Sequence, residues 1–274
     1  MPAHPHNATM IAVCSAKGGV GRTVLTANLS IALSLTGAKA CVIDGCFQFG
    51  DIQMALDLRP LFSIKDVIEQ IETIDAESLL NYLNRHDSGL RILTAPTRPE
   101  YADLVTLEAL DKIIDLLRSK FNYLIVDTMY GLQEQTLFFI ERADKILIVT
   151  DLEMATLKNT KMMLDVLTSL GLHHKVKIVV NRSTMQSVIT SRDIAQILEG
   201  ESIMYIPNDF EIVSKSINIG LPFIIKSRRS EISKTIISLA EQLSSANAVN
   251  IDKPPKSSPR LSFFQKLKGQ KERT

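Results

Sequence analysis

Three glycines, an arginine and a threonine stand together in the stretch Cys14–Val24, which reads CSAKGGVGRTV. Gly18, Gly19 and Gly21 allow backbone conformations and close approaches that a Cβ atom would obstruct. Backbone N–H groups of such a loop converge on an anion when a strand precedes it and a helix follows, and the hydroxyl of Thr23 suits Mg²⁺. The stretch therefore predicts a phosphate-binding loop; the alternative is a glycine-rich turn that binds nothing.

The segments on both sides of this loop have the required patterns. MIAVC before it predicts a strand, and VLTANLSIALSL after it predicts an amphipathic helix. Short β-branched runs alternate with helical segments along the chain, which indicates βα units. The predicted fold class is α/β: a doubly wound, mostly parallel seven-stranded sheet with helices on both faces, a Rossmann-like three-layer sandwich. The seven predicted strands are MIAVC, KACVIDG, LRILTA, NYLIVDT, KILIVTD, KVKIVVN and SIMYIP.

Helix start signals and composition shifts define the remaining organisation. Helices are predicted from Thr23, from Ser63, from Thr106, after Gly131, over Thr156–Leu170, over Thr190–Glu199 and over Ser230–Leu243. Residues 9–250 are predicted to form one domain after a flexible N-terminus, residues 1–8. Residues 251–274 are predicted to be a flexible linker, NIDKPPKSSPR, and a basic amphipathic tail.

The composition is that of a soluble globular protein, with 45% hydrophobic residues and no Trp. No stretch approaches the roughly 18 uncharged apolar residues of a membrane span, and the N-terminus has no basic n-region of a secretory signal. The three cysteines are predicted to be reduced, with Cys14 and Cys41 buried in strands. We therefore expect a cytoplasmic protein.

Positive charge is concentrated at the C-terminus, where residues 251–274 hold seven Lys or Arg against two Asp or Glu, while residues 1–250 are net negative. If residues 261–269 are helical, Leu261, Phe263, Phe264 and Leu267 lie on one side of that helix. A short basic amphipathic helix predicts reversible binding to an anionic membrane surface. The alternative is a solvated extension.

The loop departs from the common pattern GxxxxGK[ST] at Ala16 and Arg22 and resembles the deviant Walker A motif KGGxxGK[ST], with Lys17 as its early lysine. That motif belongs to the MinD/ParA family of P-loop ATPases, and the resemblance extends over residues 9–245. ACVIDGCFQFGD, YLIVDTMYG, VVNR and IPNDFEIVSKSINIGLPFI resemble successive segments of that family. FQFGDIQMALDLRPLFSIKDVI, GLRILTAPTRPEYADLVT and LKNTKMMLDVL are most similar to its CpaE/TadZ branch, the localisation ATPases of tight-adherence pilus systems.

The resemblance implies roles for particular residues. Catalytic roles fall to Lys17, Asp44 and Asp127, with Lys17 reaching phosphates across the interface of an ATP-sandwich dimer. Mg²⁺ would be held by Thr23, Asp44 and Asp127. The phosphates of ATP or ADP would be held by Lys17, Gly18, Gly19, Val20, Gly21, Arg22, Thr23 and Val24. The base pocket would be formed by Asn181, Arg182, Pro207, Asn208 and Asp209; the alternative for Asn181 is a turn residue at a strand end.

Three departures from the family pattern bear on catalysis. Arg22 replaces the loop lysine, and its planar guanidinium is no conservative substitute for an ammonium group. Cys46 stands where the family places a second acidic residue, and a thiol of ordinary pKa cannot orient water as a carboxylate does. Met129 and Tyr130 replace the prolines of a DTPPG segment. Slow hydrolysis or none is predicted; the alternative is ordinary slow ATPase activity in which Asp51 or a neighbouring carboxylate substitutes.

The predicted function is a MinD/ParA-like nucleotide-dependent homodimer that positions a membrane-associated assembly such as a Tad-type pilus. Its predicted partners are a pilus-assembly or cell-pole protein and, through the tail, the inner face of the membrane. The alternatives are a non-catalytic scaffold that retains the dimer surface and a ParA-like DNA-partitioning protein. IKSRRSEISK, with Arg228 and Arg229, is the one basic cluster of the domain, which disfavours specific nucleic-acid binding.

Overall fold

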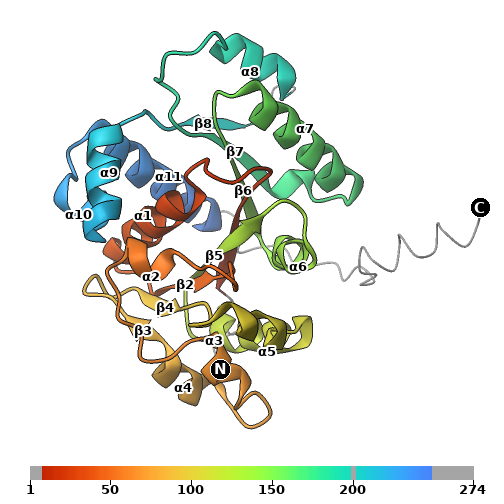
Figure 1. The fold of residues 1–274 in the computed structure, drawn as a ribbon, viewed down its shortest axis with the longest axis vertical. Helices are drawn as coiled ribbons and strands as arrows, with labels where there is room; N and C mark the ends of the chain where they lie inside the picture. Colours follow the sequence, from red (N-terminus) through yellow and green to blue (C-terminus); the bar gives the residue numbers. More distant parts are fainter. Residues whose placement is uncertain (1–7, 199–201, 249–274) are drawn as a thin grey trace, which may run out of the picture.

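The architecture is a parallel sheet between two layers of helices, seen in a computed structural model that describes residues 8–198 and 202–248 (Figure 1). The strands are β1 (Thr9–Ser15), β2 (Ala40–Asp44), β3 (Asn84–Arg85), β4 (Arg91–Leu93), β5 (Tyr123–Tyr130), β6 (Lys145–Thr150), β7 (Val176–Val180) and β8 (Ile203–Tyr205). Their order across the sheet is β3-β4-β2-β5-β1-β6-β7-β8. All pairings are parallel except that of β3 with β4. The predicted linker and tail, and residues 1–7, lie outside the described residues.

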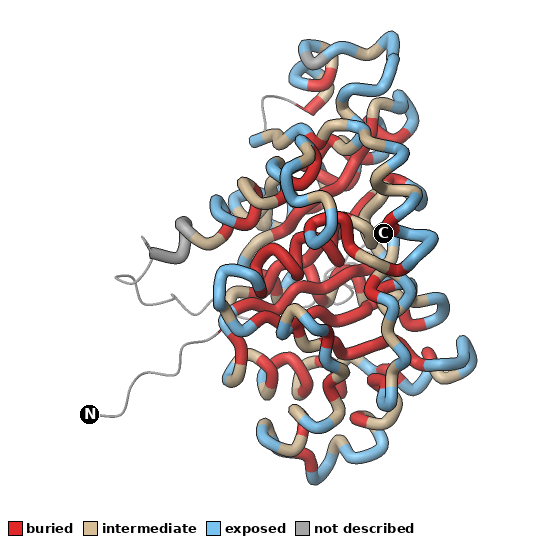
Figure 2. Tube along the Cα trace, turned by 90° about the vertical axis from the view of Figure 1, so that its left-hand side faces the viewer, coloured by how far each residue is buried: buried red, intermediate tan, exposed pale blue. Residues whose placement is uncertain are grey.

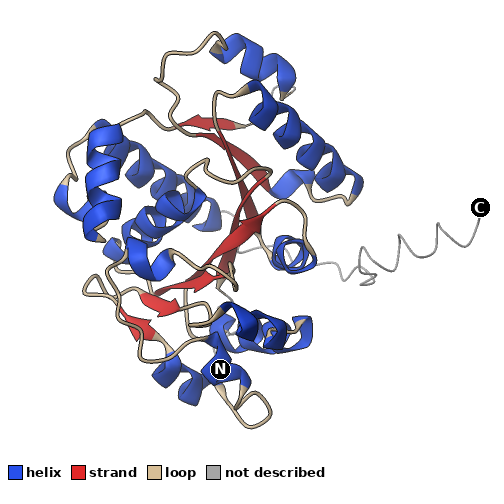
Figure 3. Cartoon of the chain, viewed as in Figure 1, coloured by secondary structure: helices blue, strands red, loops and turns tan. Residues whose placement is uncertain are grey.

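The helices occupy both faces of the sheet, as Figure 3 shows. The α-helices are α1 (Arg22–Leu35), α2 (Ile52–Ala55), α3 (Ile64–Ile68), α4 (Ala76–Leu79), α5 (Leu107–Arg118), α6 (Glu134–Arg142), α7 (Met154–Ser169), α8 (Ser191–Ile197), α9 (Phe210–Ile219), α10 (Phe223–Lys226) and α11 (Glu231–Ala248). Short 3-10 turns are η1 (Leu80–Tyr82), η2 (Pro99–Leu104) and η3 (His173–Lys175). Among the described helices, none combines the length and hydrophobicity that crossing a membrane requires.

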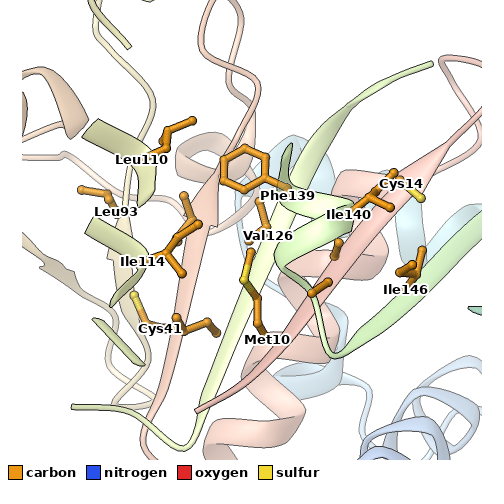
Figure 4. Packing of buried hydrophobic residues seen from close by; sticks show 14 of the residues in the cluster. Met10, Cys14, Cys41, Leu93, Leu110, Ile114, Val126, Phe139, Ile140 and Ile146 are labelled. Carbon is orange, nitrogen blue, oxygen red and sulfur yellow. The ribbon is translucent and has the colours of Figure 1, made fainter. Parts of the chain in front are cut away.

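Alternating side chains of the central strands build two separate cores, because successive side chains of a strand point to opposite faces. On β1, Met10 and Ala12 pack with α5, α6 and α7, whereas Ile11 and Val13 pack with α1, α10 and α11. Figure 4 shows the first core, where Phe139 and Ile140 of α6 lie over the sheet. Burial on both faces of the strands places the red band of Figure 2 through the middle of the molecule. Because both faces of the central strands are packed, a shift in register would move buried side chains to the wrong face.

The structure confirms the α/β class and all seven predicted strands, but the prediction of seven strands in total is wrong. The strand missing from the prediction is β3, which pairs antiparallel with β4 at the sheet edge. The tight turn between them is closed by backbone bonds from His86 to Leu90 and from Gly89 to His86. A strand of two residues carries no alternation pattern that a sequence reading can detect.

The sequence predicts the start of a helix correctly where a side chain caps that helix. Thr106 accepts a bond from the Ala109 N–H at 3.2 Å and caps α5, and Thr190 caps α8. The helix predicted over Thr156–Leu170 is α7, and its predicted start is wrong. Helix α7 begins at Met154, and Thr156 is buried inside it. Helix α11 begins one residue after the predicted Ser230 and runs beyond Leu243 to Ala248.

Gly220, the C-terminal cap of α9, provides a test of how this helix is docked. It has φ +63, and an added Cβ would lie 2.7 Å from the Cβ of Asp57 and 2.9 Å from the carbonyl oxygen of Met54. We expect Gly220→Ala to lower the free energy of unfolding by about 2–4 kcal/mol, combining left-handed strain with overpacking against the end of α2. Gly171→Ala is the matched control, because Gly171 has φ +75 with nothing within 4 Å, so strain alone of about 1 kcal/mol applies. Urea unfolding measures both; equal losses would contradict the docking.

Candidate nucleotide-binding site

The glycine loop joins the end of β1 to the start of α1 at the carboxyl edge of the sheet. Gly19 and Gly21 have φ +81 and +89, in the region that favours glycine, and Gly21 is the N-terminal cap of α1. The Nδ2 of Asn181, which follows β7, donates to the carbonyl oxygen of Val20 at 2.8 Å. A Cβ on Gly21 would lie only 2.4 Å from that Nδ2. The backbone conformation therefore requires glycine, and a side chain here would also displace the Asn181 amide.

Arg22 does not extend into solvent from the first turn of α1. Its Nε donates to Oδ1 of Asp127 at 3.0 Å, its Nη1 to Oγ of Ser15 at 3.1 Å and its Nη2 to Sγ of Cys46 at 3.3 Å. The side chain is only 11% exposed. Burial is the largest influence and lowers the pKa of Arg22, but the charge and hydrogen bond of Asp127, together with Cys46 and Cys14, outweigh it, so the pKa is raised. The guanidinium is thus a charged group built into the interior of the site.

Asp127 lies on β5 and is fully buried. Its Oδ2 accepts from the hydroxyl of Thr23 at 2.7 Å, and its Oδ1 accepts from Arg22. The single hydroxyl proton of Thr26 lies between Oδ1, at 3.2 Å, and the carbonyl oxygen of Arg22, at 3.0 Å. Burial raises the pKa of Asp127, while Arg22 and the hydroxyl donors oppose that rise. The carboxylate oxygens are therefore both engaged by the first two turns of α1.

Asp44, at the end of β2, is the register partner of Asp127 on the neighbouring strand. Its two oxygens accept the backbone N–H groups of Cys46 and Ile52, each at 3.1 Å. Burial, and then the charge of Asp127, raise the pKa of Asp44 to about 8. The backbone donors hold the side chain in place beside Asp127.

Ligand atoms of Asp44, Cys46 and Asp127 lie within 4.8 Å of one another, which is a spacing that a metal ion can bridge. Mg²⁺ takes oxygen ligands in near-octahedral geometry, usually one or two protein oxygens together with phosphate oxygens and waters. The carboxylate oxygens already accept protein donors, a guanidinium lies against Asp127, and burial raises the pKa of the Cys46 thiol to about 12. A neutral sulfur is also a poor magnesium ligand. As arranged, the predicted ligands Thr23, Asp44 and Asp127 lie together but do not fit Mg²⁺.

Lys17 lies on the outer side of the loop. Its Nζ contacts Oε2 of Glu153, the residue before α7, at 2.7 Å, and both side chains are substantially exposed. The hydrogen bond to Glu153 raises the pKa of Lys17. The structure thus separates Lys17 from the buried carboxylates with which the sequence grouped it.

A cavity of about 590 Å³ opens at this edge, within the usual size range of small-molecule sites. Of the predicted residues, its walls include Gly18, Gly19, Gly21, Arg22, Thr23, Val24, Asn181, Arg182, Pro207, Asn208 and Asp209. Val20, Asp44 and Asp127 are buried instead. The sequence reading missed Phe49 and Phe210, which also line the cavity with exposures of 74% and 76%. The available signal was the place of each phenylalanine, Phe49 in the loop after β2 and Phe210 at the first position of α9.

A strand, a glycine loop and a helix that face a cavity at the carboxyl edge of a parallel sheet define a P-loop nucleotide-binding domain. The family described as the CobQ/CobB/MinD/ParA nucleotide binding domain matches residues 11–223, and the chain belongs to this family of P-loop ATPases.

Individual relatives agree with this assignment. The septum site-determining protein MinD of Thermotoga maritima is 28% identical over 242 residues, covering 85% of this chain and 87% of the relative. MinD in the MinC:MinD cell division complex of Aquifex aeolicus has a TM-score of 0.73 at 27% identity, covering 92% of this chain and 100% of that chain. MinD of Pyrococcus horikoshii, complexed with Mg-ADP, shares the fold with a TM-score of 0.77 at 22% identity, covering 90% of this chain and 100% of that chain.

Removing either partner of the Arg22–Asp127 pair should destabilise the nucleotide-free protein strongly. Arg22→Met leaves a buried carboxylate without its cation, which costs about 3–5 kcal/mol, and Asp127→Asn leaves the guanidinium without its anion. We expect the double variant to lose less than the sum of the single variants, with a coupling of about 1–3 kcal/mol in urea unfolding.

The control for this cycle is Arg98→Met, because Arg98 and Glu100 form an exposed pair at 3.7 Å. We expect no measurable change in that variant. Strictly additive losses from Arg22→Met and Asp127→Asn would show that the pair does not stabilise the fold.

Proposed function

We propose that the chain is an adenine-nucleotide-binding switch that forms a homodimer when nucleotide occupies the glycine loop, and that it hydrolyses ATP slowly or not at all. The observation that carries the proposal is the cavity between the glycine loop and the segment from Pro207 to Phe210. The loop and the N-terminus of α1 suit phosphates, because their backbone N–H groups attract anions. Asn181, Arg182 and Pro207–Asp209 suit a base on the opposite side. The complex of the Pyrococcus horikoshii relative with Mg-ADP supports the choice of ligand.

Slow hydrolysis follows from the positions of Arg22 and Cys46. Phosphoryl transfer depends on cations and water-orienting groups placed around the transferred phosphate. Arg22 is engaged with Asp127, Ser15 and Cys46, and the raised pKa of Cys46 keeps its thiol neutral. The same two residues support the second candidate, a scaffold that binds nucleotide without turning it over.

Homodimer formation is proposed to use the face around the cavity mouth. Phe49, Tyr130 and Phe210 are large residues that line the cavity and are exposed. Lys17 lies on the outer side of the glycine loop. Its ion pair with Glu153 is exposed and weak, so Lys17 can exchange it at little cost for a phosphate of the nucleotide bound to a second subunit. The resemblance to the CpaE/TadZ branch makes a pilus-assembly or cell-pole protein the proposed partner of the dimer.

Full-length protein titrated with ATP and ADP by calorimetry, with light scattering and phosphate release measured alongside, tests this function. We expect binding of both nucleotides, an ATP-dependent dimer and a turnover below about 1 s⁻¹. Lys17→Ala should abolish the dimer while nucleotide still binds to the monomer. Lys120→Ala is the matched control, because it removes another Lys–Glu pair, with Glu77 of α4, and should leave the dimer intact. Failure to bind either nucleotide at millimolar concentration would overturn the proposal.

Recruitment to an anionic membrane surface is proposed to rest on the basic tail. Each basic residue near such a surface contributes about 1 kcal/mol, and joining two tails in a dimer raises avidity by about a hundredfold or more. We expect co-sedimentation with anionic vesicles in the presence of ATP, and its loss in a chain ending at Asn250 and in Phe263→Ala with Phe264→Ala. Vesicles of neutral lipid are the control. Equal sedimentation of all three proteins would leave the tail as a solvated extension.

A further inference from the structure

The Arg22 guanidinium lies among the side chains that the sequence predicts to hold a divalent cation. Its three nitrogens donate to three different acceptors, Asp127, Ser15 and Cys46, at 3.0–3.3 Å. The acceptors come from β5, from the end of β1 and from the loop after β2, so that three segments surround one planar group. A guanidinium held on all its edges is fixed in orientation, unlike a flexible ammonium group.

Both oxygens of Asp127 are already engaged by donors of the protein. Asp127 accepts on both oxygens, from Arg22 on Oδ1 and from Thr23 on Oδ2. The Thr23 hydroxyl directs its proton at Asp127 over 2.7 Å. A divalent ion entering this cluster must approach the positive charge of Arg22, which is already buried against Asp127. Arg22 already supplies the positive charge that Asp127 needs.

Cys46 suits this arrangement for a chemical reason. Its Sγ accepts from Nη2 of Arg22 at 3.3 Å and donates to the carbonyl oxygen of Thr128 at 3.2 Å. A carboxylate at this position would give the guanidinium a second anion and leave the cluster with excess negative charge, which favours a divalent ion. With sulfur there, one arginine and Asp127 balance each other.

We propose that Arg22 takes the place of the divalent cation, so that the cavity binds ADP and ATP as free nucleotides and does not require Mg²⁺. This inference rests on the proposed nucleotide binding. The phosphates are then held by the backbone N–H groups of the glycine loop and by the N-terminus of α1, with the Arg22 charge fixed behind them. Arg22 and Cys46 act together, because Arg22 supplies the positive charge and Cys46 accepts its hydrogen bond without adding a negative charge.

The test is calorimetric titration of the full-length protein with ADP and with ATP, in excess Mg²⁺ and in excess EDTA. For the wild-type protein we expect Kd values that agree within about threefold between the two conditions. In Arg22→Lys a single ammonium group cannot bridge Asp127, Ser15 and Cys46, so Asp127 becomes available and binding should be at least about tenfold tighter with Mg²⁺. Cys46→Asp should shift the ratio in the same direction.

Arg182→Lys is the matched control, since this exposed cavity arginine should change affinity by the same factor in both conditions. Wild-type binding that weakens tenfold or more in EDTA overturns the inference and leaves the proposed function standing. Absence of binding in both conditions overturns the proposed function and this inference with it. If Arg22→Lys fails to fold, as judged by circular dichroism, the wild-type ratio alone decides.

Discussion

The ion pair between Arg22 and Asp127 is the interaction on which the arrangement of the carboxyl edge depends. It joins the first turn of α1 to β5, while the other edges of the guanidinium reach the end of β1 and the loop after β2. The parallel register places Asp44 directly beside Asp127 on neighbouring strands. Burial and the charge of Asp127 raise the pKa of Asp44, which leaves Asp127 as the charged carboxylate, and a buried carboxylate requires a cation before any ligand arrives. Arg22 provides it from within the chain.

The two hydrophobic cores make that edge rigid enough to hold the pair in one geometry. Strands β1, β2 and β5 are buried on both faces, so they cannot slip without moving whole sets of side chains to the wrong side. The polar groups at their carboxyl ends therefore have fixed separations. Gly50 shows how closely the surroundings fit, because a Cβ there would lie 2.4 Å from Oδ2 of Asp44. Packing of the strands therefore sets the distances between Asp44, Asp127 and Arg22, and these distances determine which cation fits between the carboxyl groups.

The sequence was sufficient for the features that local pattern controls. The glycine loop with its flanking strand and helix, the buried thiols of Cys14 and Cys41, and the cap of α5 at Thr106 all follow from short-range rules, and the structure confirms each of them. The orientation of Arg22 does not follow from such rules. Its rotamer is selected by acceptors that lie 7, 24 and 105 residues away along the chain. The contact of Lys17 with Glu153 is equally remote, because it spans 136 residues.

The Asn181 amide connects two parts of the molecule that are far apart in the sequence. Its Nδ2 donates to the Val20 carbonyl and so ties the glycine loop to the β7 side of the sheet, while the same residue lines the cavity. An amide nitrogen carries two protons, so Nδ2 can hold the Val20 carbonyl with one and offer the other to a group in the cavity. One short side chain therefore sets the spacing between the glycine loop and the end of β7, and with it the length of ligand that can reach both.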